Sequence, residues 1–264
     1  MTAAGPVLTR FAATARRLAQ SGYYATPQPA SPAPSLAARL RDAPGIVAEL
    51  KPASPTQGTL RAMADPGAVA AALVKAGAAG LSALTMPERF GGSPHLLAAA
   101  RTANAPLLMK DFVVTDAQLA LGQAAGASAV LLIEPLLSRD HSEWSDADAA
   151  IAAAHARGLE VIYEVYDAAG LHAAATTRAD IIGLNARDLR LVDLLVNHAA
   201  ACAALAACPD VAAARPTLIL SGTYTADDVR RARAAAARGV LVGTHLMQDA
   251  DPAHALARLL EGLS

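Results

Sequence analysis

The sequence of 264 residues is poor in aromatic side chains, in cysteine and in net charge. Aromatic residues make up only 3% of it and apolar residues 54%, so a core has to be built mainly from Ala, Val, Leu and Ile. Such small and branched side chains suit helices that pack closely on a parallel sheet. The shortage of aromatic residues therefore favours an α/β protein.

The other shortages exclude classes of function. A formal net charge of −1 provides no basic field for nucleic acid. No apolar run reaches the roughly 18–20 residues that span a bilayer, and the N-terminus lacks the apolar segment of a secretory signal. The two cysteines, Cys202 and Cys208, have no metal-ligand spacing and are expected in the core. We expect a cytoplasmic protein with no membrane or nucleic-acid partner.

One stretch has the features of a reactive strand end. Residues Ile46–Leu50 are short and apolar and predict a buried strand, and the turn residues Ser-Pro-Thr-Gln-Gly at 54–58 follow it. Glu49 and Lys51 stand two residues apart, which places both side chains on one side of a strand. Such a pair is typical of the C-terminal mouth of a parallel α/β barrel. The alternative is an ion pair at the exposed end of an edge strand.

From residue 46 onward, apolar strands alternate with Ala-rich helices. The predicted strands are Ile46–Leu50, Gly80–Thr85, Pro106–Lys110, Ala129–Glu134, Glu160–Val165, Ile181–Asn185, Thr217–Ser221 and Gly239–Thr244. Eight strand–helix units in about 220 residues predict a (β/α)8 TIM barrel over residues 46–264. An open doubly wound sheet is the alternative, although no Gly-x-Gly-x-x-Gly follows the first strand.

Residues 1–45 are predicted to form an N-terminal helical extension and linker. An amphipathic helix is expected over Leu8–Ser21 and a second helix over Ser35–Arg41, with a Pro-rich linker at Ala25–Pro34 between them. The segment is too short for a core of its own, so we expect it to pack on the barrel. The glycines that end predicted helices, expected as left-handed C-caps, are Gly77, Gly126, Gly158 and Gly239.

Polar residues stand at the predicted C-terminal ends of the strands. They are Glu49, Lys51, Ser54, Thr85, Lys110, Asp111, Glu134, Glu164, Asn185, Arg187 and Ser221. Because unpaired buried charges are costly, the barrel predicts that these side chains converge. Lys and Glu shift their pKa values readily in a closed site, which suits acid–base chemistry on an anionic substrate. Gly222, Gly243 and Thr244, at the last two strand ends, are the expected phosphate site, with ordinary turn geometry as the alternative for the glycines.

These strand ends carry a family resemblance. The motifs are Ala-Glu-Leu-Lys at 48–51, Phe-Gly-Gly-Ser at 90–93, Lys-Asp-Phe-Val-Val at 110–114, Gly-Leu-Asn-Ala-Arg-Asp-Leu at 183–189, Ser-Gly at 221–222 and Leu-Val-Gly at 241–243. In this order, over about residues 35–260, the sequence resembles indole-3-glycerol phosphate synthase. The resemblance implies a lyase of tryptophan biosynthesis that closes a pyrrole ring on 1-(2-carboxyphenylamino)-1-deoxyribulose 5-phosphate, with loss of CO₂ and water.

The resemblance also implies roles for individual residues. Lys110 would be the acid for ring closure and Lys51 would hold the substrate carboxylate, although the split between the two lysines stays open. Glu164, together with Glu49 or Lys51, would serve the dehydration. The expected substrate contacts are Ser54, Phe90, Asn185, Arg187, Ser221, Gly222, Gly243 and Thr244, with the phosphate on Ser54, Gly222, Gly243 and Thr244. No metal or organic cofactor is implied; the partner is a small phosphorylated substrate, and the oligomeric state is left open.

The sequence departs from the family pattern at three places. Leu220 stands where the family has Glu before Ser-Gly, and Met86 stands where it has an acid after Leu-Thr. Glu134 adds a carboxylate, either as a solvent-facing residue just past its strand or as part of a site rebuilt for a related substrate. The alternative functions are therefore a diverged paralogue that acts on a related aminodeoxyketose phosphate in secondary metabolism, and a catalytically silent barrel that binds a partner enzyme.

Overall fold

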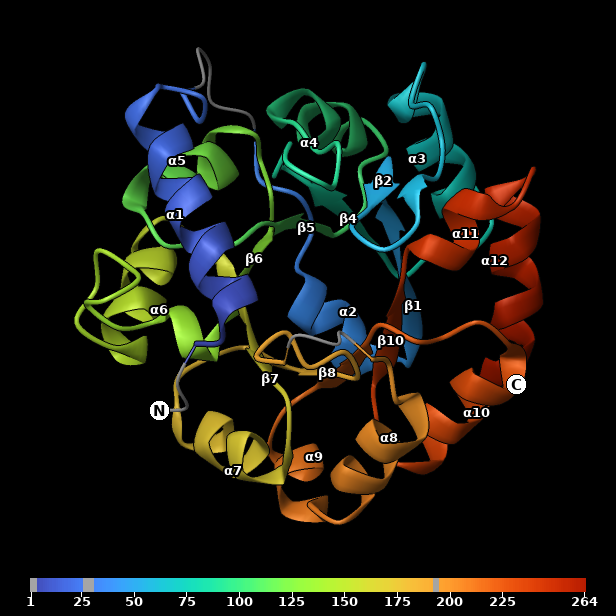
Figure 1. The fold of residues 1–264 in the computed structure, drawn as a ribbon. Helices are drawn as coiled ribbons and strands as arrows, with labels where there is room; N and C mark the ends of the chain where they lie inside the picture. Colours follow the sequence, from blue (N-terminus) through green and yellow to red (C-terminus); the bar gives the residue numbers. More distant parts are fainter. Residues whose placement is uncertain (1–3, 26–30, 192–194) are drawn as a thin grey trace.

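Eight parallel strands close into a barrel at the centre of the molecule (Figure 1). The computed structural model describes residues 4–25, 31–191 and 195–264. The barrel strands are β1 (Gly45–Leu50), β4 (Gly80–Leu84), β5 (Leu107–Lys110), β6 (Ala129–Ile133), β7 (Glu160–Val165), β8 (Ile181–Asn185), β9 (Thr217–Leu220) and β10 (Gly239–Val242). Because β1 pairs with both β4 and β10, the ring is closed and the open sheet is ruled out.

The predicted outer helices surround the barrel. They are α3 (Pro66–Lys75), α4 (Pro94–Arg101), α5 (Asp116–Ala124), α6 (Ala147–Ala156), α7 (Ala168–Thr176), α8 (His198–Ala206), α10 (Ala226–Ala234) and α12 (Pro252–Leu260). Short polar side chains cap many of these helices; Asp65, for example, accepts a hydrogen bond from Ala68 N, and Asp146 accepts one from Ala149 N. Within the described part of the chain, no helix has the length and apolar character needed to cross a membrane.

Several short elements have too few residues to show a sequence period. They are the hairpin of β2 (Ala53–Ser54) and β3 (Gly58–Thr59), α9 (Pro209–Ala214), α11 (Thr244–Gln248), and the 3₁₀ turns η1 (Glu134–Leu136) and η2 (Glu261–Leu263). Cys202 and Cys208 are buried, as expected, and each sulfur lies near a histidine.

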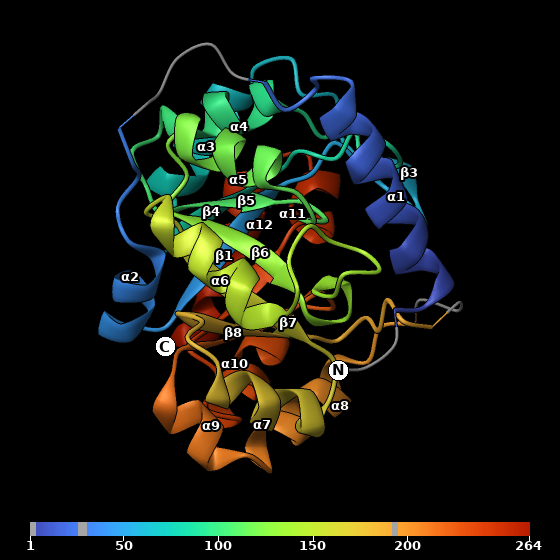
Figure 2. The same cartoon turned by 90° about the vertical axis from the view of Figure 1, so that its left-hand side faces the viewer.

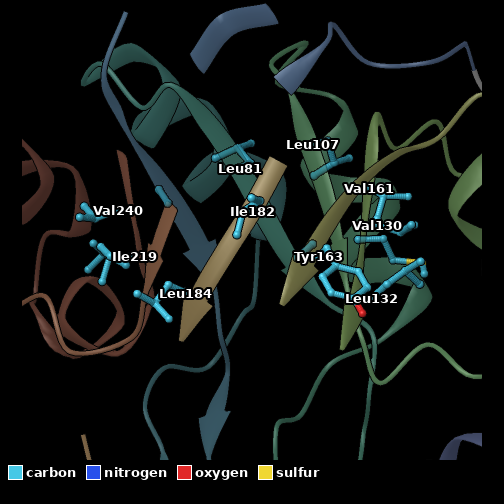
Figure 3. Close-up of a cluster of buried hydrophobic side chains, with 14 of the residues drawn as sticks. Leu81, Leu107, Val130, Leu132, Val161, Tyr163, Ile182, Leu184, Ile219 and Val240 are labelled. Carbon is cyan, nitrogen blue, oxygen red and sulfur yellow. The ribbon is translucent and has the colours of Figure 1, made fainter. Parts of the chain in front are cut away.

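Along the barrel strands other than β4, side chains alternate between two apolar clusters. One cluster fills the space between strands and helices and includes Leu81, Val130, Ile182 and Val240 (Figure 3). The other cluster lies inside the barrel and includes Val47, Leu108, Ile162 and Leu218. Because side chains two residues apart share a face, the inward face of each strand continues toward its C-terminal end through Glu49, Lys110, Glu164 and Leu220. The alternation therefore brings the polar strand ends into the mouth of the barrel.

The N-terminal extension packs on both ends of the barrel. Helix α1 (Pro6–Gln20) and helix α2 (Leu36–Asp42) lie at opposite ends of it (Figure 2). In α1, Phe11 stacks on Phe112, with 4.3 Å between the ring centroids, beyond the end of β5. In α2, the expected cap Ser35 accepts a hydrogen bond from Ala38 N, and Leu36 packs near the start of β4. The predicted linker falls partly on residues 26–30, which lie outside the described residues.

One of the four predictions of a glycine C-cap is wrong. Gly77, Gly126 and Gly158 have positive φ angles of 106°, 74° and 72°, as expected. Gly239 instead belongs to strand β10, and the left-handed residue after helix α10 is Ala236, with φ 65°. Ala236 N bonds to Arg233 O and Ala237 N bonds to Ala232 O, the double closure of a Schellman motif. An alanine thus occupies a conformation that favours glycine.

We therefore predict that Ala236→Gly stabilises the protein. Relief of the left-handed strain should exceed the added chain entropy and raise the free energy of unfolding by roughly 0.5–1 kcal/mol. Gly158→Ala is the matched control, because its added Cβ would meet no atom within 4 Å and so tests conformation alone. Urea denaturation should show opposite shifts for the two variants. A destabilised Ala236→Gly would refute the assignment of strain.

Candidate active site

A buried carboxylate lies between two lysines at the mouth of the barrel. Glu49 is 2% exposed, and its Oε2 accepts a hydrogen bond from Lys110 Nζ at 2.7 Å. Its Oε1 lies 3.8 Å from Lys51 Nζ. Burial by itself would raise the pKa of Glu49, but the charges of Lys110 and Lys51 outweigh burial and hold this pKa below its ordinary value. Glu49 is therefore an anion that holds two cations at the strand ends.

Lys51 is a lysine with a lowered pKa. Burial lowers the pKa to about 8, against the opposing charge of Glu49, and the nearby Lys110 and Arg187 add to the lowering. The Lys51 ammonium also lies 5.9 Å from the centroid of the Phe90 ring. An amine with a pKa of about 8 can give up and regain a proton near neutral pH, as acid–base chemistry requires.

A second carboxylate, Glu164, lies on the same inward face and is 1% exposed. Its Oε1 accepts hydrogen bonds from Asn185 Nδ2 at 3.0 Å and from the Tyr166 hydroxyl at 2.8 Å. Burial raises the pKa of Glu164, although Asn185, Lys110 and Tyr166 oppose the rise. Asn185 is fixed in turn, because its Oδ1 accepts a hydrogen bond from Arg187 N at 3.0 Å. The two carboxylates thus have opposite pKa shifts, which is the pattern of a divided acid–base site.

An apolar cavity opens beside these charges, and its empty space is about 710 Å³ with open solvent included. Its apolar lining includes Phe11, Met86, Phe90, Phe112, Leu131 and Ile133. Its polar lining includes Lys51, Lys110, Glu164, Asn185, Arg187 and Ser221. Helix α1 provides part of the wall through Val7 and Phe11, so the N-terminal extension completes the cavity. The cavity can hold a flat apolar group against the lysines.

A polar cavity, with about 400 Å³ of empty space when open solvent is included, adjoins the apolar one and shares Lys51, Lys110, Arg187 and Ser221 with it. The ends of β9 and β10 form its wall through Gly222, Thr223, Gly243 and Thr244. The turn after β9 is unusual, since Ser221 and Gly222 both have left-handed φ angles of 68° and 78°. Thr223 is 3% exposed, and its hydroxyl has no hydrogen-bond partner among the described residues. A buried donor of this kind suits an anionic ligand.

Gly243 has a steric reason to be glycine. A Cβ added there would lie 2.4 Å from Glu49 Oε1, which is closer than real contacts allow. The absence of a side chain on β10 therefore leaves room for the Glu49 carboxylate between the lysines. Gly243 does not have the left-handed φ that favours glycine, because its φ is −123°.

Most of the predicted residues come together, but four lie apart from the two cavities: Ser54, Thr85, Glu134 and Leu220. Ser54 lines neither cavity, and its hydroxyl lies 3.2 Å from the Thr56 hydroxyl. Glu134 is buried at 7% exposure, so it is not the solvent-facing residue that one interpretation expected. It also lies outside both cavity linings, and its charge acts on the outward-facing Tyr163. Leu220 is 1% exposed and packs inside the barrel against Gly183.

The N-terminal extension is also tied to the site through a buried acid. Asp111 accepts hydrogen bonds from Thr85 Oγ1 at 2.5 Å and from Phe112 N at 2.7 Å. Burial raises the pKa of Asp111 against these bonds and one from the Tyr24 hydroxyl. Tyr23, beside it, donates to Thr85 O at 3.1 Å. The chain just after α1 is therefore bound to the residue that follows Lys110.

Sequence reasoning missed Tyr166, Thr223 and the residues of α1. Tyr166 stands two residues after Glu164, so the strand alternation would have placed it on the same side. Phe11 offered no comparable signal, because the path of the extension over the mouth depends on tertiary packing.

The fold and the site together define a class. A closed (β/α)8 barrel with an acid–base cluster at the C-terminal ends of its strands is an enzyme that binds its substrate at that mouth. The chain belongs to the indole-3-glycerol phosphate synthase family, whose model matches residues 12–259.

Curated relatives agree with this assignment. The indole-3-glycerol phosphate synthase of Laribacter hongkongensis is 38% identical over 217 residues, covering 81% of this chain and 79% of the relative. That of Haloarcula marismortui is 40% identical over 205 residues, covering 76% and 71%. Among solved structures, thiamine phosphate pyrophosphorylase from Pyrococcus furiosus has a TM-score of 0.57 at 15% identity, over 83% of this chain and 94% of that one. At that identity the likeness shows the fold alone.

The lowered pKa of Lys51 gives a chemical prediction. Lys51, Lys75 and Lys110 are the three lysines of the chain, and Lys75 lies on the exposed side of α3. Only the neutral amine reacts with acetic anhydride, so acetylation of Lys51 should rise with pH through about 8 and then level off. Nα-acetyl-lysine amide, labelled in the same tube, is the reference, and its acetylation should continue to rise toward pH 10. Competitive labelling with mass spectrometry measures both profiles; parallel profiles would contradict the perturbation.

Proposed function

We propose that this enzyme closes the indole ring of indole-3-glycerol phosphate from 1-(2-carboxyphenylamino)-1-deoxyribulose 5-phosphate, with loss of CO₂ and water. The observation that carries the proposal is the placement of Lys51 and Lys110 between an apolar and a polar cavity. The substrate has the same division, with an aromatic ring at one end, a phosphate at the other and the reacting carbons between. Family membership supports the same reaction.

The reaction needs an acid at the middle of the substrate. As the aromatic carbon attacks the C2′ carbonyl, the carbonyl oxygen gains a proton, and Lys110 is proposed to donate it. Glu49 keeps Lys110 in place through the 2.7 Å hydrogen bond. Lys51 is proposed to hold the substrate carboxylate until CO₂ leaves, with Phe90 against the aromatic ring. Loss of CO₂ restores the aromatic ring, and this favourable step draws the closure forward.

Dehydration then needs a base and an acid. Glu164 is proposed to take a proton from the substrate, and Lys51 to donate a proton to the hydroxyl, which leaves as water, while the Glu49 anion stabilises the charged form of Lys51. Asn185, which already donates a hydrogen bond to Glu164, is proposed to bind the substrate too. Ser221 and Arg187 are proposed to line the path between the two cavities, because both cavity linings include them. A raised pKa suits Glu164, because a stronger base removes a proton more readily.

The phosphate is proposed to bind in the polar cavity, on Gly222, Gly243 and Thr244. The buried hydroxyl of Thr223, which has no hydrogen-bond partner among the described residues, is proposed as a further contact to the phosphate that the sequence did not suggest. Ser54 is left out of this set, because it lines neither cavity. The substrate is thus a small phosphorylated molecule. A diverged paralogue or a silent barrel is less well supported, since Lys51, Lys110 and Glu164 all face the cavity.

We predict that Lys110→Ala lowers kcat by at least about a hundredfold, the usual effect of losing a positioned general acid. Turnover is followed by indole fluorescence after addition of the carboxyphenylamino-deoxyribulose phosphate. Lys75→Ala is the control, because it removes a lysine from the exposed side of α3 and should leave kcat unchanged. Near-native turnover in Lys110→Ala would remove this lysine from the mechanism.

A further prediction concerns Leu220, which stands where the family has a carboxylate. Leu220 lines neither cavity, but unlike Glu134 it lies in the inner cluster at the C-terminal end of β9, and a Glu side chain there is one atom longer than Leu. We propose that this carboxylate reaches the substrate, so Leu220→Glu should raise kcat/KM on the standard substrate by roughly ten- to a hundredfold, the worth of one charge-assisted hydrogen bond. Leu220→Gln is the matched control for shape without charge and should gain much less.

Glu134→Gln separates the rebuilt-site interpretation from this one. Because Glu134 lies outside both cavity linings, its replacement should leave kcat/KM within about twofold. A damaging Glu134→Gln together with a flat or harmful Leu220→Glu would favour a site rebuilt for a related substrate.

A further inference from the structure

Glu164 is held from one side only. Its two hydrogen bonds to described side chains, from Asn185 and from Tyr166, both end on Oε1. The same carboxylate lines the apolar cavity together with Lys110. The second oxygen, Oε2, is therefore the one that remains for a ligand. A carboxylate with one oxygen fixed and the other open has a defined direction in which to take a proton.

We propose that Tyr166 is a positioning residue for Glu164. The Tyr166 hydroxyl fixes Oε1 of Glu164, so that Oε2 of Glu164 alone takes the proton from the substrate. The proposal rests on the base role of Glu164 in the proposed function. Tyr166 is absent from both cavity linings, so it acts through Glu164 and does not touch the substrate.

Tyr166 is itself fixed by an ionic cluster from the loops after β7 and β8. The Arg190 guanidinium lies 5.0 Å from the centroid of the Tyr166 ring. Arg190 is held in turn by Asp188 at 2.6 Å and by Asp167 at 3.0 Å. The phenol has to donate, because a carboxylate oxygen only accepts, and burial beside Glu164 keeps the pKa of Tyr166 well above its usual value. The ring thus keeps both its place and its proton.

Asn185 alone does not give the same constraint. One donor on one oxygen leaves the carboxylate free to turn about its terminal bond, whereas two donors from different strand ends fix its plane. The two donors and the positive charge of Lys110 favour the charged form of Glu164 and lower its pKa. Burial and the negative charge of Glu49 favour the neutral form and raise its pKa. Loss of the Tyr166 hydroxyl should therefore both loosen the base and raise its pKa.

The test is Tyr166→Phe, which keeps the ring under Arg190 and removes only the hydroxyl. At pH 7 we expect kcat to fall about tenfold with KM within about twofold. The acidic limb of the kcat profile should move to higher pH by about one unit, because Glu164 must be charged to act as a base. Tyr163→Phe is the matched control on the same strand, since Tyr163 faces outward toward Glu134, and its profile should not move.

A double-mutant cycle separates positioning from general stability. If Tyr166 acts through Glu164, the double variant Glu164→Gln with Tyr166→Phe should turn over no more than about twofold slower than Glu164→Gln alone. Additive losses would overturn the proposal, as would an unmoved acidic limb in Tyr166→Phe. Circular dichroism confirms that each variant is folded.

A direct titration of Glu164, which needs no substrate, distinguishes the role of Tyr166 from the proposed reaction. The chain has seven glutamates, so ¹³C-carboxyl labelling of glutamate, with the Glu164→Gln spectrum subtracted, follows the titration of Glu164 directly. Tyr166→Phe should raise its midpoint by about one pH unit. An unchanged midpoint would overturn the role of Tyr166 while leaving the proposed reaction intact. Full activity of Glu164→Gln would instead overturn the base role in the proposed function.

Discussion

The mouth of the barrel depends on the ion pairs that two lysines form with the buried carboxylate of Glu49. Glu49 is almost completely removed from water, and an uncompensated charge there would cost several kcal/mol. Lys110 and Lys51 supply the compensation, and the missing side chain of Gly243 leaves the space for it. Three strand ends, from β1, β5 and β10, must therefore meet correctly for the charge to be tolerated. The same arrangement that makes the charge stable places two ammonium groups at the centre of the mouth.

Around this cluster the mouth divides into an apolar and a polar half. Aromatic and aliphatic side chains from the loops after β4 and β5 and from α1 form one half, and the glycine-rich ends of β9 and β10 form the other. The division follows from closure, because strands far apart in the sequence become neighbours across the ring. Glu49 and Lys110 are 61 residues apart along the chain and share a hydrogen bond. A substrate with one aromatic and one anionic end fits such a mouth in a single orientation.

The N-terminal extension is part of the site as well as of the core. Phe11 packs against both Phe90 and Phe112, with ring centroids 5.5 and 4.3 Å away, and so closes the apolar half. The chain that follows α1 is fixed near Asp111, next to Lys110, by Tyr23 and Tyr24. Displacement of α1 would therefore open the apolar cavity and disturb the end of β5 together. This coupling gives a barrel enzyme a physical reason to keep a helix that its eight strands do not need for closure.

The sequence by itself determined the barrel and most of the site, since both follow from local periods. Strands of alternating apolar residues and capped helices predict eight units, and the strand period of two places Glu49, Lys110 and Glu164 on one face. Tertiary structure decided what depends on loop paths and on space between elements. It placed Ser54 and Glu134 away from the cavities, put Ala236 where a glycine was expected, brought Phe11 over the mouth and aimed the Tyr166 hydroxyl at Glu164. The two-residue period of a strand determines which face of the sheet each side chain takes. The partners of those side chains, and the backbone angles after a strand ends, depend on residues that become neighbours only when the barrel closes.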